Sequence, residues 1–164
     1  MFWALLTIFF ALHNPMTDFT LRKYRELLAI LQKMGYQFLT FEQYCTHTHY
    51  PLGGTLSHTQ KYIILRHDVD LKAPNSLATA QIEHELGINA SYYFRVVPQS
   101  NQPEVIRAIA AFGHEIGYHY EDMALADGDV DAAYVHFQKQ LAYFRSFYPV
   151  RTICMHGAPT SKWD

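Results

Sequence analysis

The residues best suited to chemistry in this chain are two carboxylates and two imidazoles that follow short apolar segments. Asp68 and Asp70 come directly after the apolar run at 62–65, while His119 and His156 each end a later strand-like segment. In an extended chain, side chains at i and i+2 share a face and lie roughly 6.5 to 7 Å apart, so both carboxylates can serve one site. An Asp oxygen with one or two imidazole nitrogens, and one position open to water, is typical of a catalytic zinc site. One acid would bind the ion while the other takes a proton from water.

The elements expected around these residues alternate between strands and helices. Periodicity and turn residues predict strands at 61–67, 90–97, 115–119 and 152–156, and helices at 75–86, 103–112 and 130–147. This alternation is typical of a parallel α/β sheet or barrel, in which functional residues gather at the carboxyl ends of the strands. We therefore expect the polar clusters that follow these strands to converge.

The amino-terminal third of the chain is less regular. Apolar residues at helical spacing predict a helix that Thr17 or Asp18 caps and that Gly35 ends. A short strand is expected at 37–41. The stretch 46–60 lacks periodicity and contains turn-forming residues, which predicts an exposed loop.

Size and composition indicate one globular domain without a polyanionic partner. The 164 residues are 49% hydrophobic, enough for a single core. The formal net charge of -2, without a run of like charges, argues against binding to nucleic acid or to anionic lipid. Cys45 and Cys154 lie far apart in sequence and form no CxxC pair, so neither a zinc ribbon nor a disulfide framework is predicted.

Residues 1–15 are expected to stand apart from the domain at 16–164. Their apolar run is shorter than the roughly 18 to 20 residues of a spanning helix, so no stable membrane span is predicted. One interpretation is a signal-like segment, which would make the protein exported or membrane-associated. The interpretation we favour is an upstream extension before a cytoplasmic domain that begins at Met16.

Two motifs give the chain from Lys61 onward a resemblance to a known family. The segment YIILRHDVD at 62–70 is an apolar strand that ends in two acids separated by one residue, and GHEIGYH at 113–119 closely matches a Gly-His-Glu-Ile-Gly-Asn-His run. Both resemble the polysaccharide deacetylases of the NodB-homology type, carbohydrate esterase family 4. The resemblance implies a partial, distorted parallel (β/α) barrel, here with an N-terminal helix.

The same resemblance implies roles for individual residues. Asp68 would be the catalytic base, and Asp70 and His119 would bind a divalent ion, zinc first and cobalt or nickel as alternatives. Met123 stands where the family has a second ligand histidine, so His156 is our candidate for the third ligand. The family's late Trp-containing motif and its general-acid histidine have no equivalent before Asp164, which implies a domain that is incomplete at its carboxyl end and has an open sheet edge.

Neighbouring polar residues have both functional and structural interpretations. Arg66, Glu121 and Asp122 are candidates for supporting the metal ligands or contacting substrate. Arg66 could help keep a neighbouring Asp in its ionised form, or it could pair with Glu115 or Glu121. Asp68 and Asp70 could instead form a strand-end turn that bonds local amides.

Two functions follow from these expectations. The first is a metal-dependent hydrolase that removes acetyl groups from N-acetylated sugars or cleaves a related carbon–nitrogen bond. Its substrate would be an acetylated carbohydrate or a small amide. The second is a non-catalytic carbohydrate-binding or assembly module derived from such an enzyme. The sequence indicates no particular oligomeric state.

Overall fold

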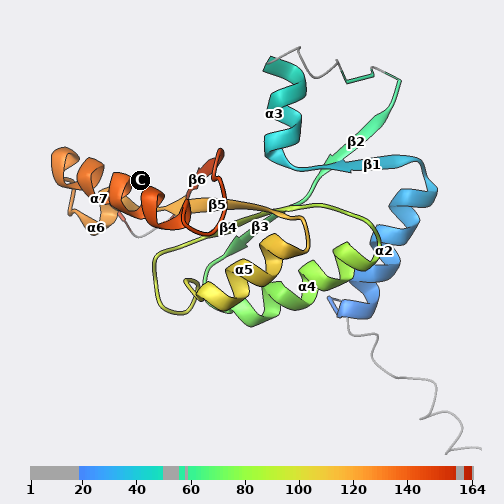
Figure 1. Ribbon diagram of the computed structural model, residues 1–164, viewed down its shortest axis with the longest axis horizontal. Coiled ribbons are helices and arrows are strands. Elements are labelled where there is room, and N and C mark those ends of the chain that lie inside the picture. The colour runs from blue at the N-terminus through green and yellow to red at the C-terminus, as the bar shows by residue number, and fades with distance from the viewer. Residues whose placement is uncertain (1–18, 50–55, 58, 158–160, 164) are drawn as a thin grey trace, which may run out of the picture.

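The strands of this protein form a curled half-barrel sheet in which every pairing is parallel (Figure 1). The computed structural model describes residues 19–49, 56–57, 59–157 and 161–163, so the segment 1–15, Met16, Thr17 and Asp18 lie outside the described residues. The strands are β1 (Tyr36–Leu39), β2 (Lys61–Ile64), β3 (Arg66–Val69), β4 (Ser91–Phe94), β5 (Glu115–Tyr120) and β6 (Ile153–Met155). The expected α/β architecture, compatible with a partial barrel, is confirmed.

The segment predicted as one strand at 61–67 is two strands. β2 pairs with β1, whereas β3 pairs with β4 in the order β3-β4-β5-β6. The change of partner occurs at Leu65, whose carbonyl accepts a hydrogen bond from the Ser91 amide at 2.9 Å. The apolar run is continuous, so its periodicity gave no sign of this change.

Helices cover one face of the four-stranded sheet. The core there combines strand residues such as Tyr92, Ile116 and Tyr118 with apolar residues of three helices. These helices are α4 (Ala73–Glu85), α5 (Pro103–Ala111) and α7 (Val130–Phe144). The short helix α6 (Asp122–Leu125), which the sequence did not predict, joins β5 to α7.

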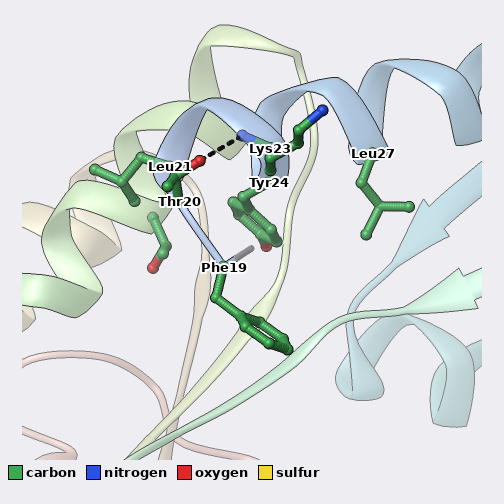
Figure 2. Close-up of a pocket in the computed structure, with 7 residues that line it drawn as sticks. Phe19, Thr20, Leu21, Lys23, Tyr24 and Leu27 are labelled. Carbon is green, nitrogen blue, oxygen red and sulfur yellow. Dashed lines mark hydrogen bonds between the residues drawn. The ribbon is translucent and has the colours of Figure 1, made fainter. Parts of the chain in front are cut away.

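Helix α2 (Leu21–Lys33) begins at a cap that differs from the expected one. Thr20 is the N-cap, and its hydroxyl oxygen accepts a hydrogen bond from the Lys23 amide at 3.2 Å (Figure 2). Gly35, with φ of 82°, follows the end of the helix as predicted.

Helix α3 (Phe41–His49) contradicts part of the loop predicted at 46–60. Its start is a capping box, in which the Gln43 amide donates to the Thr40 hydroxyl and the Thr40 amide donates to the Gln43 side chain. Four residues of the predicted loop, 46–49, therefore continue a helix that is nucleated upstream.

The opposite face of the sheet, which we call the inner face, carries the candidate site. Because side chains alternate along a strand, Arg66 and Asp68 share this face, as do Gly117 and His119. Helix α3 lies on this side of the sheet, opposite α4 and α5 (Figure 1). Its Phe41 ring contacts Tyr93 with 6.3 Å between centroids. The inner face is therefore covered near the start of its strands and polar at their ends.

Among the described residues, no helix is both long and apolar enough to cross a membrane.

Candidate metal centre

The carboxyl ends of three parallel strands bring the predicted metal ligands together. Asp70 directly follows β3, His119 lies near the end of β5, and His156 directly follows β6. The backbone amide of His156 donates to the Tyr120 carbonyl at 2.8 Å, which fixes the chain beyond β6 against β5. The expected convergence therefore occurs through parallel pairing rather than through sequence proximity.

Three donor atoms lie close to one another at this end of the sheet. Asp70 Oδ1 is 3.6 Å from His119 Nε2 and 3.3 Å from His156 Nδ1. The two imidazole nitrogens are 3.2 Å apart. Two ligand atoms on a tetrahedral zinc ion, at bond lengths of about 2.0 to 2.1 Å, are separated by about 3.3 to 3.4 Å. The three separations thus fit one zinc-sized ion without large movement.

Hydrogen bonding orients the His119 ring for coordination. Its Nδ1 lies 3.0 Å from the Cys154 carbonyl, which can only accept, so Nδ1 carries the proton. Nε2 consequently presents a lone pair toward the carboxylates. Burial lowers the pKa of His119, and this outweighs the raising influence of the Cys154 carbonyl and the neighbouring carboxylates. The neutral form, which is the form that binds metal, is therefore favoured at neutral pH.

The carboxylate oxygen that lies near both imidazoles has no hydrogen-bond donor among the described residues. Asp70 Oδ1 is buried and accepts no hydrogen bond from the described residues, although the whole side chain is 46% exposed. A buried carboxylate oxygen without a donor is costly unless a cation neutralises it. This oxygen, together with two adjacent imidazoles, fits a divalent ion. Met123 lies in α6 and does not belong to this group. The third potential ligand, after Asp70 and His119, is His156.

Asp68 lies beside this group and is held by Arg66. Arg66 donates from Nε and Nη2 to the two carboxylate oxygens of Asp68, at 2.8 and 2.7 Å. Asp68 Oδ2 is 3.9 Å from His119 Nε2. The Asp68 carboxylate raises the pKa of Arg66, which keeps the guanidinium charged. Of the interpretations considered for Arg66, the structure contains the contact with the neighbouring Asp and not the pairs with Glu115 or Glu121.

Glu121 and Asp122 make their hydrogen bonds with residues outside the cluster. Glu121 pairs with Arg95 through two hydrogen bonds, at 2.9 and 2.8 Å. Asp122 begins α6 and turns to the helix-covered face, where it accepts a hydrogen bond from Tyr118 at 2.9 Å and contacts His136. The turn after β5 redirects the carboxylate, and local spacing could not show this.

Cys154 is a potential ligand that the sequence analysis missed. It pairs in register with His119 across β5 and β6, so both side chains lie on the inner face. Its sulfur, an Asp68 oxygen and a His119 nitrogen all lie within 4.8 Å of one another. The spacing of Cys154 two residues before His156 was the available signal, because it places both on one face of the strand.

A hollow adjoins the cluster on the inner face. Its volume is about 260 Å³, and it is lined by Phe41, Cys45, Arg66, Tyr93, Thr152, Ile153 and Cys154. A second hollow, of about 320 Å³, lies around the start of α2 (Figure 2). Its lining, which includes Phe19, Tyr24 and Leu27, contains no carboxylate, imidazole or thiol. Only the first of these two hollows adjoins groups able to bind a metal ion.

Comparisons with protein-family models, with curated proteins and with solved structures found no match for this chain. A function is therefore inferred from the residues of the chain and their geometry.

Proposed function

We propose that this protein is a metal-dependent hydrolase that removes acetyl groups from N-acetylated sugars or cleaves a related amide. The observation that carries the proposal is the set of donor-atom separations among Asp70, His119 and His156, at 3.2 to 3.6 Å. Three protein ligands with an open fourth position are characteristic of catalytic rather than structural zinc sites. The resemblance of the motifs at 62–70 and 113–119 to polysaccharide deacetylases supports the same reaction class.

The residues of the cluster would have different roles in hydrolysis. Asp70, His119 and His156 would hold a divalent ion, whose chemistry would be to lower the pKa of a water and to polarise the amide carbonyl. Asp68 accepts the proton of the attacking water, and Arg66 fixes the direction of the Asp68 carboxylate. The carbon–nitrogen bond then breaks as the leaving nitrogen takes up a proton, which gives acetate and a free amine. Tyr93 and Phe41 line the adjacent hollow, where an apolar ring could support a sugar.

The base is tested by Asp68→Asn, which keeps the size of the side chain and removes its basicity. Turnover of acetylated chito-oligosaccharides should fall about 10²- to 10⁴-fold, the usual contribution of a general base, while bound zinc stays the same. Asp131→Asn, on α7 away from the cluster, is the matched control and should leave turnover unchanged. Full turnover in Asp68→Asn would remove Asp68 from this role.

One observation favours the second function, a carbohydrate-binding module without catalysis. Both oxygens of Asp68 already accept hydrogen bonds from Arg66, and a water that transfers its proton to Asp68 has to compete with these contacts. The two functions differ in the wild-type protein itself. Zinc binding with acetate release indicates the hydrolase, whereas zinc and oligosaccharide binding without acetate release indicates the module.

A further inference from the structure

His119 belongs to two groups of potential ligands. The first contains Asp70 and His156, and the second contains Asp68 and Cys154. Because Nδ1 of His119 donates to the Cys154 carbonyl, only the Nε2 lone pair can bind an ion. The two groups therefore share one donor atom and cannot both be filled at once.

The second group differs from the first in chemical softness. Cys154 contributes a sulfur atom, whereas the first group contains only oxygen and nitrogen donors. Thiolates favour zinc, cobalt and cadmium over magnesium, calcium and manganese. The separation of Asp68 Oδ2 from His119 Nε2, 3.9 Å, exceeds those in the first group, so the second group has to contract slightly around an ion.

We propose that Asp68, His119 and Cys154 form an alternative site for a thiophilic divalent cation, which overlaps the Asp70–His119–His156 site at His119. Binding at this site converts the Cys154 thiol to a metal-bound thiolate and releases its proton to solvent. This inference rests on the proposed function only in treating His119 as a metal ligand. It adds a second set of ligands around His119, in which Asp68 and Cys154 take the place of Asp70 and His156.

Occupation of the alternative site has a consequence for the proposed hydrolase. An ion bound there uses Asp68 as a ligand, so Asp68 no longer accepts a proton from water. It also takes His119 away from Asp70 and His156. Cadmium, a softer ion than zinc, should therefore inhibit the zinc-loaded enzyme, whereas magnesium and calcium, which prefer oxygen ligands, should not.

Cobalt(II) provides the test, because thiolate ligation gives it an intense charge-transfer absorption in the near ultraviolet. Wild-type protein is titrated with cobalt alone, bound cobalt is measured by elemental analysis, and the spectrum is recorded. The variants are Cys154→Ser and, as the matched control, Cys45→Ser, which changes the other thiol of the chain. His156→Ala removes a ligand from the first site only, so it should retain the thiolate absorption.

If cobalt binds at the alternative site, the thiolate charge-transfer absorption should appear in the wild type, in Cys45→Ser and in His156→Ala. It should be absent in Cys154→Ser. Cadmium should likewise protect one of the two thiols of the wild type from a disulfide reagent, and this readout does not depend on a folded variant. Bound cobalt without a thiolate absorption and without protection would overturn the alternative site and leave the proposed function standing. Absence of bound cobalt would overturn both.

Discussion

At the scale of single residues, His119 is the centre of the site. Its side chain is only 3% exposed, one ring nitrogen is fixed by the Cys154 carbonyl, and the other points at the strand-end carboxylates. A histidine held in this way would need little further ordering to act as a metal ligand. Asp70 and His156 complete the group from two other strand ends.

The buried carboxylate of Glu83 has a structural rather than a catalytic role. It lies on the helix-covered side of the sheet, fully buried, and is bonded to Tyr92 and His67, each at 2.7 Å, and to Tyr24. Burial alone would raise the pKa of Glu83, but the contacts with His67, Tyr24 and Tyr92 outweigh burial and lower it. The network joins α2, α4, β3 and β4.

Glu83→Gln should therefore destabilise the protein. The amide keeps the shape of the side chain, but its NH2 group replaces an oxygen that accepts hydrogen bonds and so faces groups that donate to the carboxylate. We expect this to cost about 1–3 kcal/mol in the free energy of unfolding. Glu85→Gln, two residues away in the same helix, changes an exposed carboxylate paired with Arg25 and should cost much less, because solvent screens that pair. Urea denaturation of both variants measures the difference, and equal losses would contradict the role given to Glu83.

The buried imidazole of His114 should make the free energy of unfolding depend on pH. It is fully buried, its Nδ1 accepts from the Ala90 amide, and its Nε2 donates to the Ala80 carbonyl. Burial lowers the pKa of His114 from its ordinary value of 6.5. The unfolded chain therefore binds more protons than the folded protein just below pH 6.5, so the free energy of unfolding falls as the pH falls through that region.

His114→Asn checks this sign, because its side-chain oxygen can still accept from the Ala90 amide while the titrating ring is gone. The urea midpoint is measured for wild type and variant at pH 7.5 and pH 5.5. The variant should lose less stability between the two values than the wild type does. A loss of the same size in both would show that His114 is not the group responsible.

At the scale of elements, the strand ends were predictable and the turns between elements were not. The apolar runs before Asp68, His119 and His156 predicted parallel strands whose ends meet, and three of the four proposed catalytic and metal-binding residues form one group of donors. The direction of Glu121 and Asp122 depends on α6 and on Arg95, which local spacing does not reveal. The start of α3 was encoded in the Thr40–Gln43 capping box, a signal that the turn residues downstream obscured.

The pairing of β4, β5 and β6 depends on a glycine. A Cβ atom on Gly117 would lie 2.3 Å from the Tyr93 ring and 3.0 Å from the Thr152 carbonyl oxygen. Tyr93 is buried and bonded through its hydroxyl to Thr152 at 2.8 Å, so neither neighbour can move freely. The Tyr93 ring thus packs across β5 only because residue 117 has no side chain.

Gly117→Ala should cost about 1–3 kcal/mol in the free energy of unfolding, the usual penalty for overpacking. The matched control is Gly157→Ala, where the added carbon meets nothing within 4 Å and the backbone angle is not left-handed. Urea denaturation should find Gly117→Ala destabilised and Gly157→Ala close to wild type. Two variants of equal stability would contradict the close packing of Tyr93 on β5.

At the scale of the whole molecule, the main core and the proposed metal centre lie on different faces of the sheet. The helix-covered face holds the main core and the Glu83 network, whereas the inner face ends in Asp68, Asp70, His119 and His156. Substitutions of the metal-binding group should therefore change metal affinity with little effect on folding. This separation makes a direct test of the site practicable.

That test is the amount of zinc bound per protein molecule, measured by elemental analysis after dialysis, in the wild type, in Asp70→Ala and in His119→Ala. Asp131→Ala and His84→Ala are controls that remove the same residue types outside the group. We predict about one zinc per molecule in the wild type and in both controls, none in His119→Ala, which removes the ligand common to both groups, and a reduced amount in Asp70→Ala, which leaves only the Asp68–His119–Cys154 group. Equal zinc in all five proteins, or none in the wild type, would contradict the metal centre.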